Sequence, residues 1–234
     1  MINRILFLWI FICPITYAQK WDMLDKDYSA SIVSIEIKMD HNIYGYGTGA
    51  IIEQVDAGDG LFKTKILTAS HNSGYHMFPK TIKKYKVRSA NGLSTDANVV
   101  YSGEYHNLAI DEERDVMVLE TKMMKMTCLN IAEKPPAKEE FITVVGLGGQ
   151  NDCTPNKENI RVFKAKRCIP DEFFVCDAYC IHGDSGGPML YNDEIISVVS
   201  GGFVTIKKGA YTWPVSGVNL GRIKEALNIY KVQK

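Results

Sequence analysis

The six residues Gly183-Asp184-Ser185-Gly186-Gly187-Pro188 carry the strongest structural signal in this chain. Glycines on both sides of a serine permit a tight turn and leave room for a carbonyl group to approach the hydroxyl. A nucleophilic serine needs that access, and it also needs backbone N–H groups that point at the oxyanion formed during attack. The segment therefore predicts that Ser185 is a catalytic nucleophile.

A serine at neutral pH also needs a base, which is most often a histidine. His71 directly follows a strand-like run, residues 66–70, so the end of a rigid strand would hold its ring. His182 is too close to Ser185 in sequence for its ring to point easily at that hydroxyl. The remaining histidines lie in polar turns or in a loop: His41, His76 and His106. We therefore expect His71 to be the base.

A carboxylate must then hold the imidazole in the right tautomer and stabilise its charged form. Asp115 opens the apolar run 115–119 (DVMVL), which is typical of a strand that enters the core. A carboxylate at such a position is costly unless it has a partner. The acidic residues 111–113 stand just before it and are expected to lie in solvent. Asp115 is therefore the predicted partner of His71.

The three segments together resemble the chymotrypsin/trypsin-like serine peptidase family, whose catalytic residues follow one another in the order His, Asp, Ser. They are residues 67–71 (LTASH), 114–119 (RDVMVL) and 183–188 (GDSGGP). The resemblance implies an all-β fold of two six-stranded antiparallel β-barrels, with a C-terminal α-helix and the catalytic residues between the barrels. It also implies a serine endopeptidase that hydrolyses peptide bonds through an acyl-enzyme on Ser185, with a His71/Asp115 relay and neither cofactor nor metal.

The same resemblance assigns further residues to the site. The N–H groups of Gly183 and Ser185 would form the oxyanion hole. The residues expected to bind substrate are Tyr179, Cys180, Ser200, Gly201, Gly202 and Gly217. Ser200 would also lie near Asp115, and residues 200–202 would pair with the substrate main chain as an added strand. The base of the specificity pocket stays open between Tyr179 and its neighbours Asp177, Ala178 and Cys180, because the loop before the nucleophile is short.

Asp184 raises a question about activation. In vertebrate-type members of the family, a cut exposes an Ile-Val-Gly-Gly terminus, and its ammonium pairs with the aspartate before the nucleophile. No such segment stands between Gln19 and Ser31. Either Asp184 pairs with another group, or a trimmed terminus such as Trp21 reaches it.

Short apolar runs separated by turn-forming residues continue through the chain, as in a barrel or a sandwich. The polar segment 133–140 (EKPPAKEE) divides them. We therefore expect an N-terminal barrel over about residues 29–125 and a C-terminal barrel over about residues 138–217. The basic run 80–88 is expected to be an exposed loop.

The end of the chain has a different pattern. Leu220, Ile223, Leu227 and Tyr230 recur at helical spacing, which predicts an amphipathic helix over about residues 218–230. The start of the chain has the features of a secretory signal peptide over residues 1–18, with Arg4 before a short apolar run and Ala18 at the end. That run is too short to span a bilayer, which takes about 20 residues.

We therefore expect the mature chain, residues 19–234, to be a single peptidase domain that is secreted into the periplasm or outside the cell, without stable membrane insertion. Its cysteines would then meet an oxidising compartment. They are Cys128, Cys153, Cys168, Cys176 and Cys180. We expect disulfides Cys168–Cys176 and Cys153–Cys180, with Cys128 as the odd thiol. Zinc is not expected, because Cys176-x-x-x-Cys180 lacks a second matching pair.

The composition limits the partners. Lys and Arg number 27 and Asp and Glu number 27, so the chain has no net charge that would attract a nucleic acid. The expected partner is a protein or peptide substrate, and we expect a monomer. An alternative function is a protease fold kept as a non-catalytic binding or regulatory module. The complete set of catalytic residues argues against that alternative.

Overall fold

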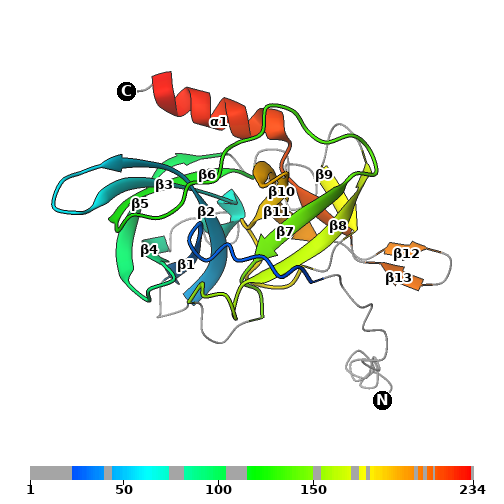
Figure 1. The fold of residues 1–234 in the computed structure, drawn as a ribbon, viewed down its shortest axis with the longest axis horizontal. Helices are drawn as coiled ribbons and strands as arrows, with labels where there is room; N and C mark the ends of the chain where they lie inside the picture. The colour runs from blue at the N-terminus through cyan, green and yellow to red at the C-terminus, as the bar shows by residue number, and fades with distance from the viewer. Residues whose placement is uncertain are drawn as a thin grey trace, which may run out of the picture.

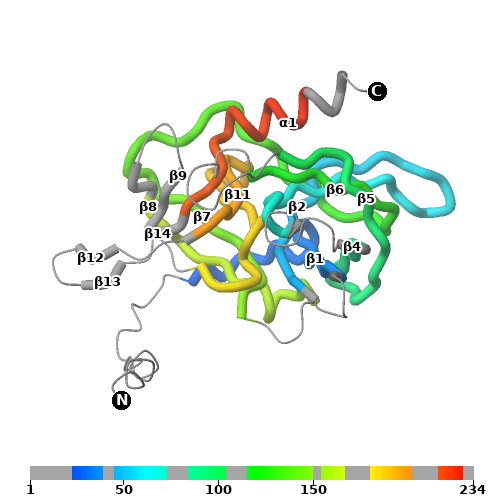
Figure 2. Tube along the Cα trace, turned by 180° about the vertical axis from the view of Figure 1, so that it is seen from behind, coloured from blue at the N-terminus to red at the C-terminus, as the bar shows by residue number. Residues whose placement is uncertain are grey.

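The computed structural model describes residues 23–39, 44–73, 82–103, 115–149, 154–169, 174–177, 180–202, 205–207, 210–212 and 214–232. Figures 1 and 2 show, from opposite sides, two β-sheets side by side, with one helix across them. The helix is α1 (Leu220–Val232), and it lies against β5 and β11, one strand from each sheet. The expectation of a mostly β fold with a C-terminal helix is confirmed.

The first sheet is a closed six-stranded barrel in the order β1-β2-β3-β6-β5-β4. Its strands are β1 (Ile32–Met39), β2 (Tyr44–Asp56), β3 (Phe62–Thr68), β4 (Ile82–Arg88), β5 (Ser94–Ser102) and β6 (Met117–Met123). β4 corrects the expectation of an exposed loop over residues 80–88. Val87 is buried in the barrel while Lys84 and Lys86 are exposed, because alternate side chains of a strand point to opposite faces.

The second sheet has the strand order β10-β11-β14-β9-β8-β7, and β7 also pairs with β10. Its strands are β7 (Phe141–Gly146), β8 (Arg161–Ile169), β9 (Phe174–Asp177), β10 (Pro188–Tyr191), β11 (Glu194–Gly202) and β14 (Pro214–Gly217). A separate two-stranded sheet consists of β12 (Thr205–Lys207) and β13 (Ala210–Thr212). Every strand pair in the three sheets is antiparallel.

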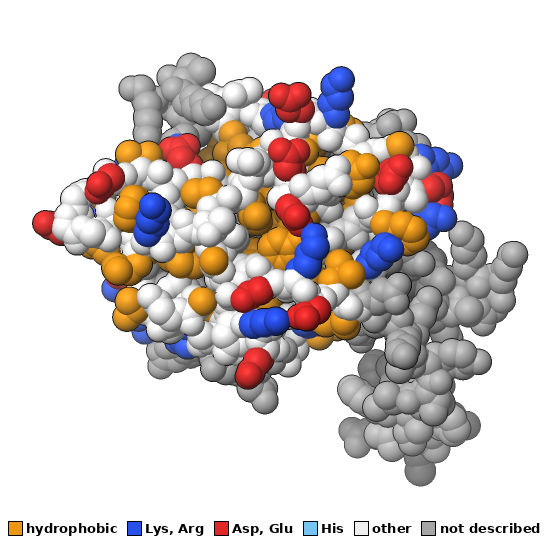
Figure 3. Space-filling model, in the orientation of Figure 1, with side chains coloured by type: hydrophobic (Ala, Val, Ile, Leu, Met, Phe, Trp, Pro, Cys, Tyr) orange, Lys and Arg blue, Asp and Glu red, His pale blue; other side chains and the backbone are white. Residues whose placement is uncertain are grey.

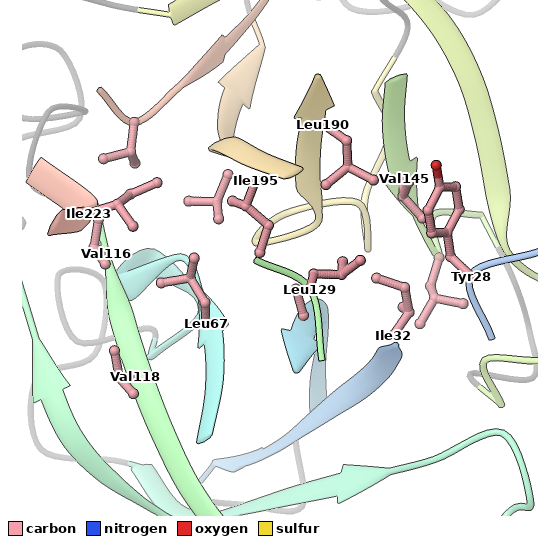
Figure 4. Close-up of a cluster of buried hydrophobic side chains, with 14 of the residues drawn as sticks. Tyr28, Ile32, Leu67, Val116, Val118, Leu129, Val145, Leu190, Ile195 and Ile223 are labelled. Atoms are coloured by element: carbon pink, nitrogen blue, oxygen red, sulfur yellow. The ribbon is translucent and has the colours of Figure 1, made fainter. Parts of the chain in front are cut away.

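The end of β3 carries apolar side chains on both faces, at Ile66 and Leu67, and both faces are covered there. Ile66 packs inside the first barrel, whereas Leu67 belongs to a cluster shared by both sheets and α1. Figure 4 shows Leu67 close to Ile195 of the second sheet and Ile223 of the helix. Truncating such a buried leucine costs about 2–5 kcal/mol. This packing holds the end of β3 against the second sheet.

Two segments of the chain cross between the sheets. Leu24 donates its N–H to Val162 O at 2.9 Å near the N-terminus. In the connection between β6 and β7, the N–H of Leu129 donates to Ile51 O at 2.8 Å, and the next residue, Asn130, accepts from Ile195 N at 2.8 Å. The connection is therefore hydrogen-bonded to both sheets. Figure 3 shows acidic and basic side chains interspersed on the face seen in Figure 1, which fits the neutral balance of charges.

Candidate active site

His71 and Asp115 are brought together by neighbouring strands. β3 pairs with β6 up to Thr68 and Met117, and the two site residues lie just beyond these ends. His71 sits in a single 3₁₀ turn, η2 (Ser70–Ser73). Its Nδ1 is 2.5 Å from Asp115 Oδ2, and its backbone N–H donates to Asp115 Oδ1 at 2.7 Å. The carboxylate thus holds both the backbone and the ring of the histidine.

Asp115 is fully buried and takes two further hydrogen bonds. Ser70 Oγ donates to its Oδ1 at 2.9 Å, and Ser200 Oγ of β11 donates to its Oδ2 at 2.5 Å. Burial alone would raise the pKa of this carboxyl. The electrostatic interaction with His71 and the hydrogen bonds from His71 and Ser200 outweigh burial, so the pKa of Asp115 lies below its ordinary value. Asp115 therefore stays ionised and joins the two sheets.

The loop that carries Ser185 is pressed against the end of β3. Gly186 has φ 82°, and a Cβ there would lie 2.0 Å from Thr68 Oγ1, so only glycine fits. The carbonyl oxygen of Ser185 accepts from Thr48 N and from Asn72 Nδ2, each at 2.9 Å. Asn72 is the residue after His71, so the nucleophile loop and the histidine turn are directly tied.

The Ser185 side chain is half-buried, and its hydroxyl makes no hydrogen bond with the residues that the structure describes. Catalytic hydrogen bonds are often long without substrate and shorten in the complex. The backbone around Ser185 is what positions it. Thr48 supports the loop a second time, because its Oγ1 donates to Gly183 O at 2.7 Å and accepts from Leu147 N at 3.1 Å.

The N–H groups of Gly183 and Ser185 have no acceptor among the described residues, unlike those of Asp184 and Gly186. Asp184 N donates to Ile181 O at 3.0 Å, and Gly186 N donates to Val199 O at 2.7 Å. Within the described part of the chain, no acceptor bonds the N–H of Gly183 or of Ser185. Gly183 has φ 100°, a value that favours glycine. The two groups flank Asp184, where an oxyanion hole would lie.

Asp184 has an internal cation as its partner. Arg161, the first residue of β8, places Nη1 2.5 Å from Asp184 Oδ2, and both groups are largely or fully buried. The N–H groups of Gly148 and Ile181 donate to the same carboxylate at 2.7 and 2.9 Å. Burial raises the pKa of Asp184, and the Arg161 charge and these hydrogen bonds oppose that rise. Of the two alternatives left open by the sequence, Asp184 pairs with another group.

The specificity residues are described only in part. Tyr179 and Ala178 lie outside the described residues, as does the side chain of Asp177, whose backbone ends β9. Cys180 is half-buried. A Cβ on Gly217 would lie 2.3 Å from Ser197 Oγ and 2.9 Å from Met189 Sδ, both buried in the second sheet. A side chain larger than glycine would therefore meet core side chains at Gly217, and the expected substrate-binding role of Gly217 stays a prediction.

The cysteine predictions are tested only in part. Cys128 is a free thiol, as expected. Cys153 lies outside the described residues, so the expected Cys153–Cys180 disulfide stays a prediction. Cys168 and Cys176 lie on the paired strands β8 and β9, and their side chains are outside the described residues. Among the residues that the structure does describe, no three His, Cys, Asp or Glu side chains gather as a metal site would require. No helix in this part of the chain is long and apolar enough to cross a bilayer.

Four residues of the site were not assigned from the sequence. They are Thr48, Ser70, Asn72 and Arg161. For Arg161 there was a usable signal, since it is a lone charge between the apolar residues Ile160 and Val162. A buried charge needs a partner, and Asp184 was the acid without one.

The comparisons with known proteins agree with this geometry. A family model described as a trypsin-like peptidase domain matches residues 47–195. The structure of the serine endoprotease from Yersinia pestis has a TM-score of 0.61 at 17% identity, over 86% of this chain and 63% of that one. The active form of the Rv3671c protease from M. tuberculosis has a TM-score of 0.59 at 18% identity, over 86% of this chain and 80% of that one.

The chain thus spans less than two thirds of the Yersinia pestis protein in that structure. A search of curated proteins finds no match. At these identities the structural matches show a shared fold, so the expected trypsin-like architecture is confirmed. The family match supports a serine-type endopeptidase.

Proposed function

Since the chain belongs to the trypsin-like peptidase family, we propose that it is a secreted serine endopeptidase in which Ser185 attacks the scissile carbonyl. His71 takes the proton of the Ser185 hydroxyl and later gives it to the leaving amine. Asp115 keeps the ring in the tautomer that accepts at Nε2 and stabilises the imidazolium. The single observation that carries this proposal is the pair of contacts from Asp115 to the backbone N–H and the Nδ1 of His71.

The proposed oxyanion hole consists of the N–H groups of Gly183 and Ser185. Their lack of acceptors among the described residues supports this role, because donors that are already aimed cost no reorganisation when the oxyanion forms. Residues 200–202 at the end of β11 would bind the substrate main chain. Hydrolysis then proceeds through an acyl-enzyme that water attacks with His71 as base.

The proposed enzyme does not wait for an amino-terminal cut. The Arg161 guanidinium supplies the positive charge that Asp184 needs, and β8 carries it as part of the sheet. A buried carboxylate without a partner would be costly and would disturb the loop on which the oxyanion hole depends. The internal ion pair removes that requirement from the start.

The remaining parts of the proposal rest on the sequence. Residues 1–18 would direct secretion, and residues 19–234 would act as one monomeric domain on protein or peptide substrates. The second sheet would close as a barrel that matches the first, which the pairing of β7 with β10 supports. The chemistry would use only groups of the chain itself.

The test is labelling of purified residues 19–234 with a fluorophosphonate probe, read by intact mass and by peptide mapping. We expect one adduct, on Ser185, and no adduct in His71→Ala or Ser185→Ala. Asp115→Asn should label far more slowly, because the ring loses the tautomer that accepts the serine proton. Lack of labelling in a folded wild-type chain would reject the enzyme and favour the binding or regulatory module.

A further inference from the structure

The ribbon formed by β12 and β13 stands apart from both larger sheets. Figure 1 shows it projecting from the side of the second sheet, away from the first barrel. Among the described strands, β12 and β13 pair only with each other. An isolated two-stranded hairpin is marginally stable in water, so a ribbon of this kind gains from a third strand.

The ribbon continues the strand pair β11–β14 without a change of register. Gly201 pairs with Ser216 and Gly202 pairs with Val215. Thr205 then pairs with Thr212, and the pairing runs on to Lys207 with Ala210. Counted from Gly202–Val215, each step forward on one strand is matched by one step back on the other, so the two pairs of strands share one register. We refer to the described strands β11, β12, β13 and β14 together as the long hairpin.

The two sides of this long hairpin differ. Along its β14 side, Pro214–Gly217 pairs with β9. Along its β11 side, β10 pairs only as far as Val198, and within the described strands none pairs with residues 200–202 on that side. This open edge begins beside the nucleophile loop, because Val199 exchanges hydrogen bonds with Gly186 and Gly187 at 2.7 and 2.8 Å. β12 prolongs the same edge away from Ser185.

We propose that the β12 edge binds the substrate main chain beyond residues 200–202, so that the enzyme prefers long, extended polypeptide segments over short peptides. This inference rests on the proposed function. The substrate strand would lie antiparallel to β11, with its scissile carbonyl at Ser185. The residues before the scissile bond would then lie along β11 toward Gly202. Lys207 lies five positions past Gly202, so the edge reaches about the eighth residue before that bond.

This arrangement has a consequence for turnover. Binding energy from residues remote from the scissile bond can be used to orient the reacting carbonyl, so long substrates gain in kcat/KM. Main-chain pairing makes few demands on side-chain identity, and it requires a segment that is unfolded or already extended. The substrate class is therefore unfolded protein or exposed extended segments, cut at sites that the specificity pocket selects.

The experiment uses nested peptides built on a cleavage site mapped in reduced, denatured casein, with three to eight residues before the scissile bond. We expect kcat/KM to rise about 10-fold or more from the shortest to the longest peptide. In a variant with Thr205–Thr212 replaced by Asn-Gly, a two-residue turn that closes an antiparallel pair, that gain should fall below about two-fold. The matched control replaces residues 57–61, at the tip of the β2–β3 hairpin, in the same way and should keep the full gain.

A second measurement leaves the protein unchanged. N-methyl groups placed one at a time on residues six to eight of the longest peptide, which would lie along β12, should lower kcat/KM at alternate positions, because alternate residues direct their N–H to the neighbouring strand. No gain with length, or a gain that survives in the shortened variant, would overturn the inference while hydrolysis of the three-residue peptide upholds the proposed function. Failure of the wild type to cleave any peptide would overturn both.

Discussion

Arg161 Nη1 lies 2.5 Å from Asp184 Oδ2, and Asp184 lies in the chain between Gly183 and Ser185, the two residues proposed to bind the oxyanion. Asp184 is fully buried, and two glycines lie close to its carboxylate. A Cβ on Gly146 would lie 2.2 Å from Asp184 Oδ1, and one on Gly148 would lie 2.7 Å from the same atom. The carboxylate is thus enclosed with one cation, and the loop before Ser185 is built on that pair.

Arg161→Ala should slow fluorophosphonate labelling of Ser185 by about 100-fold, a loss comparable to that of an oxyanion donor. It should also lower the free energy of unfolding by about 3–5 kcal/mol, since a buried charge loses its partner. Arg222→Ala, which removes an exposed ion pair with Glu225, is the control and should change neither quantity much. Normal labelling in Arg161→Ala would show that the pair does not support the loop.

The stability deficit of Arg161→Ala should depend on pH. Burial raises the pKa of Asp184 in the folded state, and loss of the guanidinium raises it further. A raised folded pKa gives stability that is lost as pH rises, so the deficit should be larger at pH 8 than at pH 5. Denaturant unfolding of both proteins at the two pH values measures it. Asp184→Asn in the Arg161→Ala background should recover part of the loss.

The amino terminus should be irrelevant to activation. Chains that begin at Gln19, or that carry a folded tag before it, should label at Ser185 at rates within about two-fold of each other, because no free ammonium is needed at Asp184. Intact mass before and after labelling shows whether any cut occurred. If labelling appears only after an amino-terminal cut, the internal ion pair is insufficient for activity.

Ser200→Ala should destabilise the protein by about 1.5–3 kcal/mol at pH 7, because Asp115 loses a hydrogen bond to its charge. The pKa of Asp115 is lowered in the folded state, and Ser200 contributes to that lowering. A lowered folded pKa gives stability that is present above the ordinary value and lost below it, so the deficit should shrink as pH falls below about 4.

Ser197→Ala is the matched control, since Ser197 Oγ donates to the neutral carbonyl of Val218 at 2.7 Å and is equally buried. Its deficit should not change with pH over the same range. Urea unfolding at pH 7, 5 and 3.5 distinguishes the two serines. A deficit in Ser200→Ala that is constant across these pH values contradicts the assigned role.

Gly47→Ala and Asn72→Ala should act through the same contact. A Cβ on Gly47 would lie 2.4 Å from Asn72 Nδ2, so the amide must move and lose its hydrogen bond to Ser185 O. Each variant should slow labelling of Ser185 by about 5–30-fold, which corresponds to one hydrogen bond worth about 1–2 kcal/mol. The double variant should be no slower than the worse single variant, and additive losses would show that the two residues act independently.

The sequence predicted a strand where apolar and polar side chains alternate clearly, and it missed a strand where charged residues are frequent. Residues 80–88 look like a solvated loop because their basic residues are frequent. In the structure residues 82–88 form β4, in which Tyr85 and Val87 lie against the barrel core while Lys84 and Lys86 are exposed. The many basic residues obscured the alternation of buried and exposed side chains, and pairing with β1 made the segment a strand.

The specificity pocket shows another limit. The number of residues between β9 and Ser185 did not determine which side chain forms its base, and the substrate-binding role of Gly217 likewise stays a prediction. A glycine can serve an open cleft or a crowded core, and its neighbours in sequence do not distinguish the two.

The sequence by itself determined the order of His71, Asp115 and Ser185, the tight glycine turns around the nucleophile, and a mostly β chain that ends in a helix. These features depend on local backbone requirements and on periodicity, so adjacent residues reveal them. Only the tertiary structure decided that Arg161 neutralises Asp184 and that Asn72 holds the carbonyl of Ser185. Those partners are 23 and 113 residues apart, so no pattern of adjacent residues connects them. The first pair meets when the second sheet forms, and the second pair meets because apolar faces of the two sheets pack together.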